Sequence, residues 1–152
     1  MKLSRLEKCK IAIKKGIKYN SSTGDVIGVK GNHFKRKVQG YTIVTLTVNG
    51  KDYNLYAHQF AWFCIYNEIV KEIDHINGDR SDNRIENLRS VTHQQNNFNK
   101  LNVKGYCYDK TRNKFLATIK INGVNKNLGR FDKEEDARKA YLKAKEKYHK
   151  YD

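Results

Sequence analysis

The sequence predicts an α+β chain of small sheets and short helices. Three observations support this. The dipeptide Asn-Gly, the preferred two-residue turn of β-hairpins, occurs at 49–50 and at 122–123 between runs that suit strands. Residues 60–65 form an almost wholly apolar run that fits a buried helix. A polar segment at 72–97 joins two short strand-like runs to the start of another helix.

Charge divides the chain of 152 residues into three parts. Residues 1–50 carry 11 basic and 2 acidic side chains, residues 51–100 carry 6 and 7, and residues 101–152 carry 14 and 7; the net charge is +15. This excess predicts a polyanionic partner. Nucleic acid fits better than a membrane, because no basic amphipathic helix with a bulky apolar face stands out.

The sequence also indicates the compartment. No run is long and apolar enough to cross a bilayer, and no apolar leader follows Met1. Cys9, Cys64 and Cys107 have no paired spacing, which indicates reduced packing thiols instead of disulfides or a zinc ribbon. We therefore expect a cytoplasmic protein with no membrane contact.

The sequence predicts a β-rich region over residues 1–50. Residues 1–18 are Lys-rich, and their apolar residues are too irregular to define an element. A turn at 21–25 precedes a short strand at 26–29, and residues 30–40 are expected to form a loop. The first hairpin takes residues 41–48 and 53–56. The loop carries a basic run that we assign to DNA binding, Lys35, Arg36 and Lys37.

A buried helix is predicted over residues 56–66. His58 near its start leaves two interpretations open, a partly buried polar residue or a catalytic one. We favour the first, because histidines of this kind are common near protein interiors.

The last third predicts a second hairpin and a helix. Residues 114–121 alternate between apolar and polar, and residues on either side of the Asn-Gly turn pair and share a face. The expected open face holds Thr118, Lys120, Asn125 and Asn127. The expected core side holds Phe115, Ala117, Ile119, Ile121, Val124, Lys126 and Leu128. Asp132 and Glu135 resemble a capping box, and the helix that follows has an apolar stripe to cover the sheet, made of Ala137, Ala140, Tyr141, Ala144 and Tyr148.

The chemistry is concentrated in residues 72–97. Asp74 and His75 end a short strand, residues 89–92 form the return strand, and the helix that follows holds Asn96. Asp74 offers a hard anionic oxygen suited to Mg²⁺, and Asn96 offers a neutral oxygen to the same ion. His75 points to the other side of the strand, where it can face a water, and its ordinary pKa of about 6.5 suits a general base.

This segment resembles the catalytic core of His-Asn-His (HNH) endonucleases, the ββα-metal motif of phage and intron homing enzymes. The matching residues are Asp74-His75-Ile76-Asn77-Gly78-Asp79, Asp82-Asn83-Arg84, Asn87-Leu88-Arg89 and Gln95-Asn96. The resemblance spans residues 54–100. It implies that Asp74 and Asn96 hold one divalent metal, Mg²⁺ or Mn²⁺, and that His75 is the general base. It also implies that Asn87 stabilises the loop that orients this base.

Residues 104–148 resemble the plant ethylene-response-factor (Apetala-type) DNA-binding domain. The matching residues are Gly105-Tyr106, Tyr108-Asp109-Lys110, Lys114-Phe115-Leu116-Ala117, Leu128-Gly129, Phe131, Glu135, Ala137 and Ala140-Tyr141. Tyr106 and Phe115 stand where Val and Trp are usual, and both remain apolar. The resemblance implies a three-stranded sheet plus helix whose sheet enters the major groove. We assign DNA contacts to Lys110, Arg112, Lys114, Thr118, Lys120, Asn125 and Asn127.

The predicted domains are a basic N-terminal β-rich DNA-binding region (1–50), a central ββα-metal HNH nuclease core (51–100) and an ethylene-response-factor-like domain (101–152). The favoured function is a monomeric, site-directed homing endonuclease of double-stranded DNA from a phage or mobile element. A non-catalytic, sequence-specific DNA-binding regulator is the alternative, although intact Asp74, His75 and Asn96 argue against it. A structural zinc protein is weaker, because no ligand pair has suitable spacing.

Overall fold

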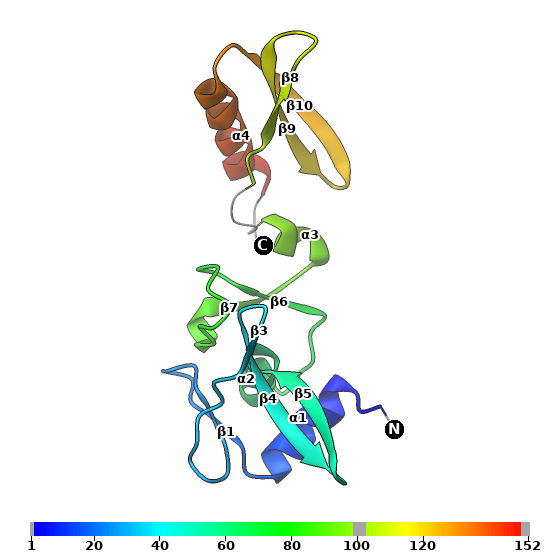
Figure 1. The fold of residues 1–152 in the computed structure, drawn as a ribbon, viewed down its shortest axis with the longest axis vertical. Coiled ribbons are helices and arrows are strands. Elements are labelled where there is room, and N and C mark those ends of the chain that lie inside the picture. Colours follow the sequence, from blue (N-terminus) through cyan, green and yellow to red (C-terminus); the bar gives the residue numbers. More distant parts are fainter. Residues whose placement is uncertain (1, 99–102, 150–152) are drawn as a thin grey trace. The chain divides into compact units, whose positions relative to one another are not determined.

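The computed structural model describes residues 2–98 and 103–149, apart from the side chains of Gln94 and Phe98. Its mixture of small antiparallel sheets and helices is the α+β class that the sequence predicts (Figure 1). The chain divides into two compact units, Met1–Thr92 and His93–Asp152. These boundaries differ from the three regions expected from the sequence, because the first hairpin crosses position 50. The functional division into three regions stays a prediction.

The first unit contains three small antiparallel sheets, β1–β2, β3–β4–β5 and β6–β7. Its strands are β1 (Lys18–Tyr19), β2 (Val26–Ile27), β3 (Lys37–Val38), β4 (Tyr41–Val48), β5 (Lys51–Tyr56), β6 (Glu72–His75) and β7 (Leu88–Val91). Its helices are α1 (Arg5–Lys14), α2 (Ala57–Tyr66) and the short 3₁₀ helix η1 (Ile85–Asn87). The predicted turn of the β4–β5 hairpin is confirmed, since Asn49 and Gly50 have φ of 50° and 74°.

Helix α1 is an element that the sequence reasoning left undefined. Ser4 caps it, because its hydroxyl accepts from the Glu7 backbone while the Glu7 carboxylate accepts from the Ser4 backbone. Cys9 and Ala12 are its buried residues. A stripe this narrow gives little hydrophobic periodicity, which explains why the helix was missed.

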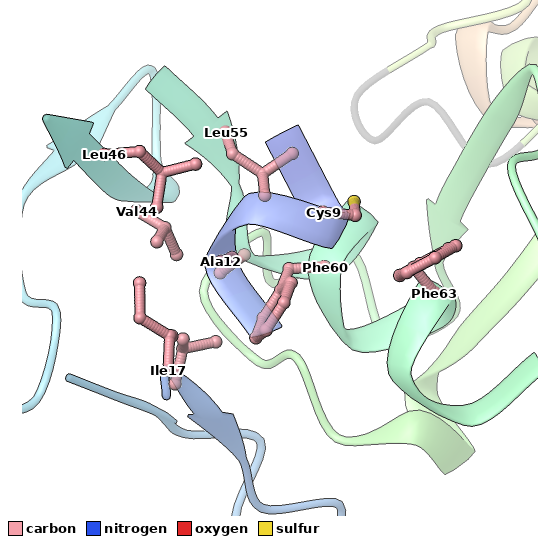
Figure 2. Packing of buried hydrophobic residues seen from close by; sticks show 10 residues of the cluster. Cys9, Ala12, Ile17, Val44, Leu46, Leu55, Phe60 and Phe63 are labelled. Atoms are coloured by element: carbon pink, nitrogen blue, oxygen red, sulfur yellow. The ribbon is translucent and has the colours of Figure 1, made fainter. Parts of the chain in front are cut away.

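Helix α2 is the buried helix that the apolar run predicts, and it joins two hydrophobic clusters. Phe60 and Phe63 enter the larger cluster, whose other labelled members in Figure 2 are Cys9, Ala12, Ile17, Val44, Leu46 and Leu55. Ala61 and Trp62 enter a smaller cluster with Leu88 of β7. Burying a side chain the size of Phe60 contributes about 1.5–3 kcal/mol. Through these contacts α2 ties the β6–β7 pair to the rest of the unit.

The second unit contains a three-stranded antiparallel sheet in the order β10–β9–β8. Its elements are α3 (His93–Phe98), β8 (Tyr106–Asp109), β9 (Lys114–Ile121), β10 (Val124–Phe131) and α4 (Glu134–Tyr148). Helix α4 lies against the sheet (Figure 1) and buries Ala137, Tyr141 and Ala144. A Cβ on Gly105, whose φ is +77°, would lie 2.0 Å from the Tyr141 ring, so this close approach requires glycine.

Two details of the second unit differ from expectation. The predicted capping box is wrong, because Lys133 is the N-cap of α4 and makes no side-chain cap. Asp132 instead pairs with Lys114 of β9, their charged atoms 3.1 Å apart. Val124, expected on the core side, is 69% exposed. Lys126 does reach the helix side, where its Nζ donates to the Tyr148 hydroxyl, so Val124 lies at the hairpin tip beyond this contact.

No helix of residues 2–98 and 103–149 is both long and apolar enough to cross a membrane.

Candidate active site

The β6–β7 pair places Asp74 and His75 at neighbouring positions of one strand. Across the pair, Asp74 lies opposite Arg89 and His75 lies opposite Leu88. Neighbouring residues of a strand point to opposite faces, so the two side chains meet different surroundings. Asp74 contacts a guanidinium, whereas His75 contacts an amide and aromatic rings.

Asp74 is a buried carboxylate held by Arg89. Its Oδ2 accepts hydrogen bonds from Arg89 Nε at 2.9 Å and Nη2 at 2.7 Å. These charge-assisted bonds offset part of the cost of burying the charge. The pair fixes the direction of a hard oxygen donor, and the chemistry of that donor fits Mg²⁺ or Mn²⁺.

His75 is held by an amide that the sequence reasoning did not single out. Its Nε2 lies 3.4 Å from Oδ1 of Asn83, which is 3% exposed. Asn83 Nδ2 donates to the backbone carbonyl of Ser81 at 3.0 Å, so Oδ1 is the atom that faces His75. Because an amide oxygen only accepts, the hydrogen-bond network assigns the proton of neutral His75 to Nε2. Nδ1 is then the nitrogen that can accept a proton.

Aromatic rings surround His75. The ring of His58 lies 5.2 Å from it and the ring of Tyr41 lies 5.8 Å from it, measured between ring centroids. Arg80 lies over the Tyr41 ring at 5.0 Å and donates to the Gln39 carbonyl. His75 is only 4% exposed in this setting.

Burial has a direct effect on the protonation of His75. It lowers the pKa of His75 below its ordinary value of 6.5, while the hydrogen bond with Asn83 and three nearby carboxylates partly oppose this. The carboxylates are those of Asp74, Asp79 and Asp82. At neutral pH the imidazole is therefore mainly uncharged and able to accept a proton.

The loop between the two strands is held by side-chain amides. Asn87 Oδ1 accepts from the Asn77 backbone at 2.9 Å, and Asn87 Nδ2 donates to the Asp82 carbonyl at 2.8 Å. Asn77 Nδ2 also donates to the Asp82 carboxylate at 2.9 Å. Asn87, predicted from the resemblance to stabilise this loop, thus connects its beginning to its middle.

The N-terminal region supports this loop from outside. The Tyr19 hydroxyl donates to the Asn83 carbonyl at 2.7 Å. Gly24 approaches so closely that a Cβ there would lie 2.5 Å from the Arg84 backbone nitrogen. Arg84 itself clamps Asp82 through Nε at 2.9 Å and Nη2 at 2.7 Å, which lowers the pKa of Asp82 to about 2. The sequence assigned residues 1–50 to DNA binding alone, so this structural role was missed.

The second predicted metal ligand, Asn96, lies on α3 and therefore in the second unit. Its pairing with Asp74 on one ion stays a prediction. Among the described residues, no group of three His, Cys, Asp or Glu side chains is placed to hold a metal. A metal at Asp74 would accordingly depend on amide, water or substrate oxygens for its remaining ligands.

The predicted DNA-contacting residues fall into two sets. Lys35, Arg36 and Lys37 are exposed at β3, and Arg36 donates to Asn54 Oδ1 at 3.4 Å. In the second unit, Arg112 pairs with Asp109, and Lys114 pairs with Asp132. On the face expected to be open, Thr118 is half-buried. The exposed members of the second set are Lys110, Arg112, Lys120, Asn125 and Asn127.

Comparisons with known proteins identify the central segment. Residues 55–98 match the family model of the HNH endonucleases. The chain is also similar to a solved structure described as "DNA binding and cleavage by the HNH homing endonuclease I-HmuI", with 25% identity and a TM-score of 0.46. That likeness covers 70% of this chain and 68% of the other. A search among curated proteins found no match.

Residues 55–98 therefore match an HNH endonuclease domain, and this match supports a nuclease that hydrolyses DNA. The matched range includes the four residues predicted for catalysis and metal binding, Asp74, His75, Asn87 and Asn96, whose roles stay predictions. The match ends before residue 104, so the resemblance of the last third to ethylene-response-factor domains stays a prediction.

Proposed function

We propose that this nuclease is a site-directed DNA endonuclease in which His75 is the general base. The observation that carries the proposal is the geometry of His75. Asn83 assigns its proton to Nε2, and burial keeps the ring uncharged at neutral pH. With its proton on Nε2, the neutral ring would accept a proton at Nδ1, one residue from the carboxylate of Asp74.

The reaction is hydrolysis of a phosphodiester. His75 Nδ1 accepts a proton from water while the water oxygen bonds to phosphorus, and the bond from phosphorus to the 3′ oxygen breaks. The leaving oxygen takes up a proton from solvent. A divalent metal held by Asp74 and Asn96 would stabilise the negative charge that develops on the phosphate and on the leaving oxygen. HNH nucleases generally use such a metal; our proposal is Mg²⁺ or Mn²⁺.

In this proposal the basic flanks of the chain bind DNA. Lys35, Arg36 and Lys37 would contact phosphates, and the exposed β9–β10 face would contact the duplex through Lys120, Asn125 and Asn127. Each phosphate contact would add about −0.9 to the slope of log affinity against log salt. The motif from Asp74 to Asp79 supports a homing-type enzyme of phage or mobile-element origin. One active site per chain supports a monomer that nicks one strand.

The test is cleavage of supercoiled plasmid in Mg²⁺ or Mn²⁺. We expect the wild type to nick the plasmid and EDTA to abolish nicking. His75→Ala should lower the nicking rate by at least about 10²-fold, the usual contribution of a general base. His33→Ala is the matched control, because His33 is an exposed histidine of the same unit that pairs with Asp25. Equal nicking by His75→Ala and His33→Ala would overturn the proposal.

The non-catalytic regulator makes a different prediction for the same preparation. It would bind the plasmid or an operator-like duplex with full affinity and leave it supercoiled under every metal condition. Binding without nicking would therefore favour the regulator over the endonuclease.

A further inference from the structure

His58 is a buried histidine that the proposed reaction does not use. It is the second residue of α2 and is 7% exposed. Its Nδ1 has no hydrogen-bond partner among the described residues. A protonated imidazole would bury an unpartnered, charged N–H there, which costs more than an unpartnered neutral group. The ring is therefore uncharged.

Two tyrosines from the end of the β4–β5 hairpin hold this ring. His58 stacks on Tyr56, with ring centroids 5.5 Å apart and planes 22° apart. It also meets Tyr41, with centroids 5.2 Å apart. Tyr56 immediately precedes α2, and the body of that helix is anchored in the core by Phe60. His58 is thus attached to a rigid part of the unit.

The His58 ring also contacts His75, the proposed general base. His58 meets His75 in a T-shaped contact, with centroids 5.2 Å apart and planes 79° apart. Aromatic rings favour this edge-to-face arrangement. Tyr41 also contacts His75, so the two rings restrict the imidazole together.

His75 needs such support for a conformational reason. Rotation of a histidine ring about its last side-chain bond has a broad, two-fold preference, so the strand alone does not fix the ring plane. The hydrogen bond to Asn83 is 3.4 Å, which is long for this type of bond. A ring flip would place ring carbons where Nδ1 and Nε2 now lie, which would break the hydrogen bond to Asn83 and remove the proton-accepting Nδ1 from its place.

We propose that His58 is a positioning residue, whose uncharged ring, held by Tyr41 and Tyr56, keeps the His75 imidazole in the orientation set by Asn83. The inference rests on the proposed role of His75 as general base. Burial lowers the pKa of His58 to about 3, with smaller effects from His75 and Arg5, which agrees with a ring that carries no charge and does not act as a second base.

The test compares three variants of the full-length protein in single-turnover plasmid nicking, with DNA affinity measured separately. His58→Ala removes the ring, and His58→Phe keeps a ring without nitrogens. Phe63→Leu is the matched control, because Phe63 is 4% exposed on the same helix but belongs to the large core cluster. All rates are measured at a temperature where each variant is folded.

We expect His58→Ala to lower the cleavage rate about 10- to 100-fold with DNA affinity unchanged, the usual effect of misplacing a catalytic group by about 1 Å. The cleavage rate of His58→Phe should stay within threefold of the wild-type rate. The rate of Phe63→Leu should do so too, although its Tm is lower. A wild-type rate in His58→Ala overturns the proposal. So does a loss in Phe63→Leu equal to that in His58→Ala, or a His58→Phe as slow as His58→Ala, since the nitrogens would then be the functional part.

A spectroscopic measurement separates this inference from the proposed function. Long-range ¹H–¹⁵N spectra of the histidine rings at pH 8 report which nitrogen of His75 carries the proton, without any cleavage. We expect one Nε2–H form in wild type and a mixture of forms in His58→Ala. A single, unchanged form in both proteins overturns the positioning role, even if His58→Phe does not fold. If the wild type does not nick DNA, the proposed function fails. The spectra would still test whether His58 restrains the His75 ring.

Discussion

The β6–β7 pair with its loop and the β8–β9–β10 sheet show two ways of stabilising strands. In the first, side-chain amides satisfy the loop backbone, as Asn87 does for Asn77 and Asp82. In the second, apolar alternation buries Ala117 and Ile119 under α4. The amide network fixes the position of single groups, whereas the alternation fixes a face. In the proposed function, the first would hold the general base and the second would offer a surface to DNA.

This difference predicts very different costs for single substitutions. In the amide network one side chain controls the tautomer of His75, so a small change should have a large effect on rate. On the exposed face of the sheet, many weak contacts add up, so each should matter little.

The largest effect is expected at Asn83. Asn83→Ala removes the acceptor that assigns the His75 proton to Nε2, and the cleavage rate should fall about 100-fold, since a wrong tautomer disables a histidine base. Asn83→Asp keeps an acceptor and should retain most of the rate. Single-turnover nicking measures both. Equal rates for the two variants would contradict the assigned tautomer.

The next effect is on stability. Asn87→Ala leaves the Asn77 N–H and the Asp82 carbonyl without the Asn87 amide. The free energy of unfolding of the first unit should therefore fall by about 2 kcal/mol, which lowers its Tm by about 10 °C. The fluorescence of Trp62, the single tryptophan of the chain, reports unfolding of this unit. Asp132→Ala in the second unit removes an exposed ion pair and should change stability by less than about 0.5 kcal/mol. An unchanged Tm in Asn87→Ala would show that other contacts hold the loop.

Acid should destabilise the first unit through His58. The folded pKa is lowered to about 3, so between pH 6.5 and 3 the unfolded chain binds a proton that the folded chain excludes. Stability therefore falls on acidification, by about 1 kcal/mol from pH 6.5 to 5.5 for this residue. Urea unfolding followed by Trp62 fluorescence at the two pH values measures it. His58→Phe should reduce the pH dependence by that amount, and an equal dependence in both proteins would contradict the assignment.

The smallest effect concerns the sheet surface. Lys120→Ala removes an exposed cation of the expected DNA-binding face and should weaken binding about threefold, with a salt slope lower by about 0.9. Lys126→Ala is its control, because Lys126 reaches back to Tyr148 of α4. Fluorescence anisotropy with duplex DNA over a salt series distinguishes the two. Equal losses would mean that net charge, and not this face, governs binding.

Local chemistry explains what could be predicted. Both Asn-Gly turns have positive φ at the two central residues, which few other residue pairs tolerate, so the hairpins followed directly from the sequence. The apolar run gave α2, and the motif gave the strand that ends in Asp74 and His75. Each of these signals lies within a few residues of the element that it specifies.

The capping boxes show where local chemistry fails. Ser4 and Glu7 form a true box and start α1, although their spacing was not used as a signal. Asp132 and Glu135 have the equivalent spacing and form none, because Lys133 is the N-cap of α4; the Asp132 carboxylate pairs with Lys114 of β9. Equal spacing therefore does not by itself decide the residue at which a helix begins.

The same distinction applies to the proposed catalytic residues. The sequence by itself determined which groups are available, because the order of Asp74, His75, Asn87 and Asn96 and the basic flanks are covalent facts. Only the tertiary structure decided which nitrogen of His75 can accept a proton and what restrains its ring. Those depend on Asn83, His58 and Tyr41, which meet His75 only after the β4–β5 hairpin, α2 and the loop have packed together.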